Sequence, residues 1–188
     1  MIPGTNEGAP TQVEWTEAEV AQIDEIAARY PTRRSAMLPV LWMAQRKWEW
    51  LSLDILKLCA QTLDLPPSEV LAVASFYTML KKEPTGKYLI QVCQTLPCKL
   101  AGCEKMISHL EEALGIRAGQ TSEDDLFSLE RVECLASCGS APMMQVNDDF
   151  YECLTSERIN EILDGFRSGD PLPVPRPEVD QWQWKHES

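Results

Sequence analysis

The sequence is short of positive charge. It carries 17 Lys and Arg against 29 Asp and Glu in 188 residues, which gives a formal net charge of −12. Nucleic acids and anionic membrane surfaces bind proteins through clustered cations. We therefore expect neither of them to be a main partner of the chain.

Long apolar runs are also missing. The longest apolar-rich stretch, Val70 to Leu80, is interrupted by Ser75 and Thr78. It falls short of the roughly 20 residues that a membrane-spanning helix needs. The segment Met1 to Gly8 has neither the basic and apolar regions of a secretory signal nor the arginines of a transit peptide. These absences predict a cytoplasmic chain without direct membrane insertion.

Motifs for nucleotide binding and hydrolysis are absent as well. The chain has no G-x-G-x-x-G after a strand, no G-x-x-x-x-G-K-S/T, no H-E-x-x-H and no G-x-S-x-G. Only two histidines are present: His186 lies in the tail, and His109 is interpreted as a surface or packing residue. We expect no complete active site in this chain alone.

What is present is an ordinary globular composition, with 44% hydrophobic and 24% charged residues. Residues 1–14 are expected to be a flexible leader, and residues 15–84 a helical bundle. Thr16 and Glu19 have the spacing of a capping box, Ser52 and Ser68 are candidate N-caps, and Pro39 suits a first helical turn. The apolar periodicity predicts helices over 17–30, 39–48, 53–63 and 69–77.

The periodicity changes after Pro84-Thr85-Gly86, a turn signal. Residues 85–169 are expected to form an α+β domain in the order β-α-β-β-β-α. The expected strands are 88–93, 127–134, 142–146 and 150–152, and the expected helices are 98–114 and 156–168. Residues 170–188 are a Pro/Trp-rich C-terminal arm whose alternating prolines predict an extended chain.

The spacing of four cysteines indicates a metal site. Cys93 and Cys98 form C-x4-C at the end of the first expected strand, and Cys134 and Cys138 form C-x3-C after the second. In a chain expected to be cytoplasmic, such pairs favour metal ligands over disulfides. Four thiolates complete the two tetrahedral irons of a 2Fe–2S cluster. A zinc site and inert thiols remain as alternatives, although iron is favoured by the long separation of the pairs and by the lack of a nearby His ligand.

Three further cysteines are predicted not to be ligands. Cys103 falls five residues after Cys98, inside the expected helix, and is predicted to face away from the other cysteines. Cys59 and Cys153 are both predicted to be core residues. Because the sequence has no motif that indicates a substrate pocket, a 2Fe–2S cluster here would make the chain a one-electron carrier that needs a partner.

At these residues the chain resembles a known family, the E-type subunits of NADH-quinone oxidoreductase (respiratory complex I). The resemblance covers roughly residues 15–168. The matching stretches are Tyr30-Pro31, Arg34 to Leu41, Val73 to Tyr77, Gly86 to Tyr88, Val92-Cys93 with Cys98, Val132 to Leu135 with Cys138, Ala141-Pro142, Gln145 to Asn147 and Leu154-Thr155.

The resemblance implies a thioredoxin-like ferredoxin domain behind a small helical bundle. It implies one 2Fe–2S cluster bound by Cys93, Cys98, Cys134 and Cys138. It also implies a partner flavoprotein subunit that binds FMN and NADH, together with the other subunits of the peripheral arm. Through that assembly, the chain would lie on the inner face of the bacterial plasma membrane, where the whole enzyme passes electrons to quinone.

The sequence departs from the family pattern in places. Ala136 and Ser137 stand where the family commonly has glycine, and Cys103 replaces a small residue. None of these differences removes an expected ligand.

Two alternative functions stay open. One is an equivalent subunit of an NAD-dependent hydrogenase or formate dehydrogenase, and the other is a zinc-stabilised binding module without a redox role.

Overall fold

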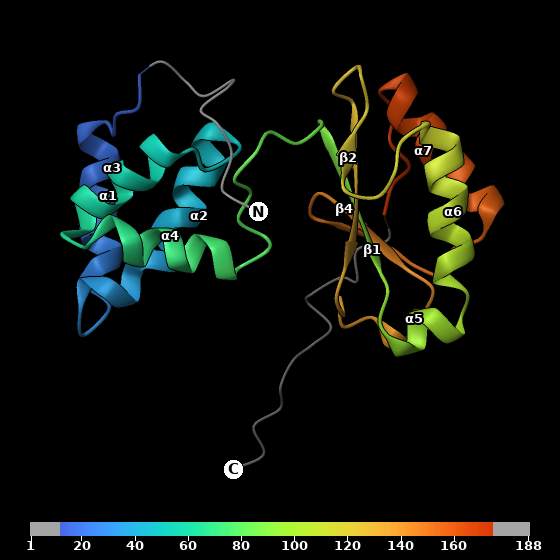
Figure 1. Ribbon diagram of the computed structural model, residues 1–188, viewed down its shortest axis with the longest axis horizontal. Helices are drawn as coiled ribbons and strands as arrows, with labels where there is room; N and C mark the ends of the chain where they lie inside the picture. Colours follow the sequence, from blue (N-terminus) through green and yellow to red (C-terminus); the bar gives the residue numbers. More distant parts are fainter. Residues whose placement is uncertain (1–11, 175–188) are drawn as a thin grey trace, which may run out of the picture. The chain divides into compact units, whose positions relative to one another are not determined.

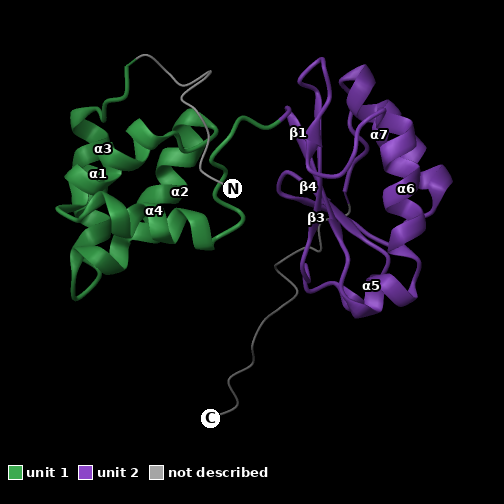
Figure 2. Cartoon of the chain, in the orientation of Figure 1, with its two compact units in different colours: residues 1–85 green, residues 86–188 purple. Residues whose placement is uncertain are grey.

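The computed structural model describes residues 12–174. Most of the expected leader and most of the C-terminal arm, with Trp182 and Trp184, lie outside the described residues. The chain divides into two compact units, residues 1–85 and residues 86–188 (Figure 2). None of the helices in residues 12–174 combines the length and the apolarity that spanning a membrane requires.

The first unit is helical (Figure 1). Its elements are α1 (Glu17–Ala27), the 3-10 turn η1 (Arg33–Ala36), α2 (Met37–Trp48), α3 (Leu53–Leu63) and α4 (Pro67–Phe76). Their apolar faces form one buried core, and the helical bundle expected from the sequence is confirmed. The Ser52 side chain caps α3 by accepting a hydrogen bond from the Ile55 N–H.

Ser68 is not a cap, contrary to the prediction. Helix α4 begins at Pro67, with Pro66 as its extended N-cap residue. Proline suits the first helical position because its fixed φ matches the helix and its missing N–H would be unpaired there anyway. Helix α2 likewise begins before Pro39, at Met37, because η1 leads directly into it.

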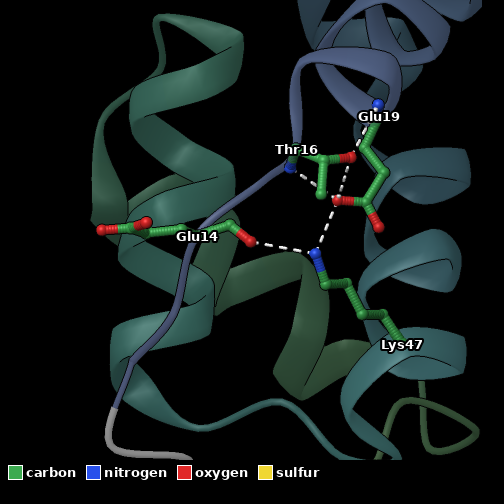
Figure 3. Close-up of polar contacts among 4 residues, drawn as sticks. All are labelled: Glu14, Thr16, Glu19 and Lys47. Carbon is green, nitrogen blue, oxygen red and sulfur yellow. Dashed lines mark hydrogen bonds and ion pairs between the residues drawn. The ribbon is translucent and has the colours of Figure 1, made fainter.

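A capping box starts α1, as the sequence predicted (Figure 3). The Glu19 N–H donates to the Thr16 hydroxyl at 3.3 Å, and the Thr16 N–H donates to the Glu19 carboxylate at 2.7 Å. Lys47, from α2, adds a long-range tie: its Nζ lies 2.5 Å from the same carboxylate and 2.9 Å from the Glu14 carbonyl oxygen. The hydrogen bonds from Lys47 and from the Thr16 N–H lower the pKa of Glu19.

Thr16→Ala removes the hydroxyl half of this capping box. We expect the free energy of unfolding to fall by about 1 kcal/mol, because one N–H at the start of α1 loses its partner. Urea unfolding of the full chain measures the change. Thr78→Ala, at an exposed threonine outside the helices, is the control and should change the value by less than about 0.5 kcal/mol. Equal effects of the two substitutions would contradict the capping role.

The second unit is a five-stranded sheet with helices, in the residues that the structure describes. The strands are β1 (Tyr88–Cys93), β2 (Gln120–Thr121), β3 (Phe127–Val132), β4 (Met144–Val146) and β5 (Asp149–Tyr151), in the order β2-β3-β1-β4-β5. Strands β1 and β3 are parallel, and the other pairs are antiparallel. Figure 1 shows α6 (Cys103–Leu114) and α7 (Ser156–Ser168) side by side on one face of the sheet.

One expected helix is divided in two. The sequence predicted a single helix over 98–114, but the structure has α5 (Leu96–Leu100) followed by α6. The break falls at Gly102, whose φ of 99° is a left-handed conformation that glycine adopts without steric cost. Cys103 is therefore the first residue of α6 rather than a residue in the middle of a helix.

The parallel pairing of β1 with β3 positions the cysteines. Cys93, the last residue of β1, is opposite Val132, the last residue of β3. Parallel strands in this register end at the same edge of the sheet. The loops that follow them, one leading to Cys98 and the other containing Cys134 and Cys138, therefore begin next to each other.

Candidate metal centre

The two cysteine loops meet at this edge of the sheet. Cys93 and Cys98 lie in one buried cluster, and the Sγ atoms of Cys134 and Cys138 lie 3.6 Å apart. Leu135, which follows Cys134, packs against the cluster that contains Cys93. The structure thus places both cysteine loops at the same edge of the sheet, with the Cys134 and Cys138 thiols as direct neighbours.

The site is buried on one side and open on the other. Cys93 and Cys98 are only 1% and 2% exposed, and they pack with Met143 against the half-buried Leu135 and Ala141. Cys134 and Cys138, in contrast, are exposed. Leu96, the first residue of the short helix α5, is 68% exposed.

Hydrogen-bond donors surround the sulfur atoms. The Thr95 hydroxyl lies 3.3 Å from Cys93 Sγ, and the Ala136 N–H donates to Cys134 Sγ at 3.3 Å. Ala136 has a φ of 65°, a left-handed conformation. Such donors stabilise anionic sulfur, as a thiolate ligand or a metal–sulfur cluster requires.

The thiol pKa values respond differently within the site. Burial alone would raise the pKa of Cys93, but the hydrogen bonds from Thr95 and Leu135 outweigh it, so this pKa lies below its ordinary value. Burial, together with the neighbouring Cys93, raises the pKa of Cys98 to about 11. The hydrogen bond with Cys134 raises the pKa of Cys138. In the metal-free protein, Cys93 is thus the more readily ionised thiol of the buried pair.

Cys103 was predicted to face away from the other cysteines, and this prediction was wrong. It is fully buried in the same apolar cluster as Cys93, Cys98 and Met143. The prediction assumed one continuous helix, and the break at Gly102 rotates Cys103 toward the other cysteines.

The other two predicted core cysteines differ from each other. Cys59 is fully buried in the helical unit, as predicted. Cys153 is exposed, so that prediction was wrong. It occupies a turn after β5 with a φ of 49°, and its backbone N–H donates to the Ser140 carbonyl oxygen.

His109 has a packing role in the structure. His109 is hydrogen bonded through Nε2 to Asn160 at 2.8 Å, between α6 and α7, as a packing residue would be. In residues 12–174, and thus also among the four cysteines, no group of three or more His, Cys, Asp or Glu side chains has the arrangement that would hold a metal ion. Whether the four cysteines act as ligands stays a prediction.

Comparison with known proteins identifies the family. The chain matches the family described as thioredoxin-like 2Fe-2S ferredoxin over residues 23–167. It therefore belongs to the thioredoxin-like 2Fe–2S ferredoxin family. The family, the sheet of the second unit and the helices that precede it confirm the fold class predicted from the sequence.

Two curated proteins that are similar to this chain are subunits of NADH-quinone oxidoreductase. NADH-quinone oxidoreductase subunit 2 of Thermus thermophilus is 44% identical over 153 residues, which cover 80% of this chain and 84% of the relative. An E-type subunit of NADH-quinone oxidoreductase from Rhizobium meliloti is 42% identical, over 79% of this chain and 89% of the relative. The chain is thus a member of the E-type subunits of NADH-quinone oxidoreductase, as its sequence motifs indicated.

A solved structure shows the same arrangement of elements. The crystal structure of an NAD+-reducing NiFe-hydrogenase in the air-oxidized state matches with a TM-score of 0.64 and 25% identity. The match covers 78% of this chain but only 24% of the hydrogenase chain. The present chain therefore spans about a quarter of that hydrogenase chain.

Cys59 and Cys153 allow a simple test of which cysteine side chains are buried. In the folded, metal-free protein at neutral pH, we expect N-ethylmaleimide to modify Cys153 rapidly and to leave Cys59 intact. Cys59 is fully buried, and burial raises its pKa to about 12, so it is neither accessible nor ionised. Peptide mass spectrometry measures both sites, and unfolding in urea is the control in which both react. Modification of Cys59 at the rate of Cys153 in native buffer would contradict the structure.

Proposed function

We propose that Cys93, Cys98, Cys134 and Cys138 bind one 2Fe–2S cluster and that the chain is a one-electron carrier. It would serve the NADH-oxidising module of NADH-quinone oxidoreductase. The observation that carries this proposal is the convergence of two thiol pairs from the ends of two parallel strands. Membership of the 2Fe–2S ferredoxin family and the names of the relatives support it.

The spacing of the exposed pair fits a shared metal ion. In a tetrahedral thiolate site with metal–sulfur bonds of about 2.3 Å, two sulfurs on one ion lie about 3.8 Å apart. The 3.6 Å between the Sγ atoms of Cys134 and Cys138 is close to this value. The buried Cys93 and Cys98 would form the second pair, so that each pair would hold one iron of a two-iron centre.

The chain's own residues set the conditions for electron transfer. A bound 2Fe–2S centre supplies reversible one-electron chemistry, and its potential depends on burial and on hydrogen bonds to sulfur. Met143 and Leu135 would exclude water from the inner side, while the N–H groups of Leu135, Ala136 and Met143 would stabilise the negative charge. Cys134 and Cys138 leave the outer side open to a redox partner.

The proposed partner is a flavoprotein subunit that carries FMN and oxidises NADH. The chain itself has no dinucleotide-binding motif, so NADH must be bound elsewhere. Leu96 and Leu100, on the helix that carries Cys98, are 68% and 81% exposed, as apolar residues of a docking surface would be. Together with the other peripheral-arm subunits, this partner would hold the chain at the inner face of the plasma membrane.

A hydrogenase role is a second candidate, favoured by one observation. The NAD+-reducing hydrogenase has the same fold as the described part of this chain. Its identity of 25% is, however, well below the 44% of the NADH-quinone oxidoreductase relative. We therefore place the chain in the quinone-reducing enzyme, and the subunits that co-purify with it separate the two candidates.

Substitution of one proposed ligand tests the cluster. Cys98→Ala should lose most of the iron, the acid-labile sulfide and the visible absorption, because one iron is left with an incomplete ligand set. Cys103→Ala is the matched control, since Cys103 is buried in the same cluster of residues. It should keep the iron–sulfur centre and lower the free energy of unfolding by about 1 kcal/mol through a small cavity. Loss of the iron in the Cys103 variant, or colourless wild-type protein containing zinc, would contradict the proposal.

The docking surface is tested at Leu100. We expect Leu100→Glu to weaken binding to the flavoprotein subunit about tenfold, which corresponds to about 1.4 kcal/mol, because a carboxylate would replace an apolar contact. The visible spectrum of the variant should be unchanged. Leu100→Met, which conserves volume and apolarity, is the control and should bind like the wild type. Titration calorimetry measures both, and equal affinities would argue against docking at α5.

A further inference from the structure

We infer that Glu152 is a positioning residue for the segment 134–140, which we name the cysteine loop. Both Ser137 and Ser140 donate hydroxyl hydrogen bonds to the same oxygen of Glu152, Oε1. The two hydroxyl oxygens also lie 2.8 Å from each other. One carboxylate thus joins two points of the loop that contains Cys134 and Cys138. The inference rests on the proposal that these cysteines bind the cluster.

The cysteine loop has little else to hold its shape. None of its side chains is buried, and its regular structure is the three-residue turn η2 (Cys138–Ser140). Ala136 is in the left-handed conformation, which costs a non-glycine residue free energy. Within the loop, only the half-buried Leu135 packs against the apolar cluster around Cys93, so polar contacts contribute to where Cys134 and Cys138 lie.

Glu152, in contrast, is attached to a well-packed part of the fold. It lies between the buried Tyr151, at the end of β5, and the segment that leads to the buried Leu154. Next to it, the Cys153 N–H donates to the Ser140 carbonyl oxygen at 2.8 Å, and the Leu154 N–H donates to the Pro142 carbonyl oxygen at 3.0 Å. The carboxylate thus fixes the position of the cysteine loop relative to the sheet.

The hydrogen bonds favour the charged form of this group. Those from Ser137 and then Ser140 lower the pKa of Glu152, so it is a carboxylate, and an acceptor only, at neutral pH. Ser137 lies directly before Cys138, and it occupies a position where a glycine could make no such contact.

The test compares Glu152→Ala with Glu133→Ala in the full chain. Glu133 is exposed and adjacent to Cys134, so its substitution removes the same charge near the loop without removing the two serine contacts. We expect Glu152→Ala to release iron to a chelator at least fivefold faster than the wild type, and Glu133→Ala to stay within twofold. Glu152→Gln, whose amide oxygen can accept both hydrogen bonds, should restore most of the stability.

A second measurement does not depend on the cluster. In metal-free protein, hydrogen exchange of peptides that contain the cysteine loop should be faster in Glu152→Ala than in Glu133→Ala. If Glu152→Ala fails to fold, the double substitution Ser137→Ala/Ser140→Ala leaves the carboxylate in place and should accelerate exchange in the same peptides. Equal exchange and equal iron release in all variants would overturn the positioning role. Wild-type protein that binds no iron–sulfur centre would instead overturn the proposed function, while the exchange data would still decide the role of Glu152.

Discussion

The parallel pairing of β1 with β3 is the constraint on which the proposed metal centre depends. It places the ends of the two strands, Cys93 and Val132, side by side, so that two loops far apart in the sequence leave the sheet together. Separate turns can then contribute two thiols each. An antiparallel arrangement of the same strands would send these loops to opposite edges of the sheet. The apolar core beneath the sheet, shared with α6 and α7, holds this pairing in place.

The resulting site is asymmetric, and its two halves suit different tasks. Cys93 and Cys98 lie in an apolar environment with backbone donors, where burial and hydrogen bonds control the energy of a negative charge. Cys134 and Cys138 lie at the surface, on a loop that polar contacts to Glu152 tie to the sheet. An electron carrier that contacts its partner at one face needs both halves. The buried half defines the reduction potential, and the exposed half lets the electron pass to the partner.

Much of this could be predicted from the sequence, because it depends on local signals. The strand 88–93, the capping box at Thr16 and the cap at Ser52 were found where local patterns predicted them. The direction of Cys103 could not be predicted, because it depends on the backbone conformation of Gly102 inside an otherwise regular helical pattern. Strand β2 has only two residues and so shows no periodicity. The contact of Glu152 with Ser137 joins residues fifteen positions apart, which no spacing rule indicates.

The central claim is that two thiol pairs hold two irons at the end of the parallel strands. Anomalous diffraction at the iron absorption edge, from crystals of anaerobically reconstituted protein, tests this most directly. The account predicts two adjacent iron peaks, one beside Cys93 and Cys98 and the other beside Cys134 and Cys138. A single peak, a signal at the zinc edge instead, or iron bound by Cys103 would contradict it.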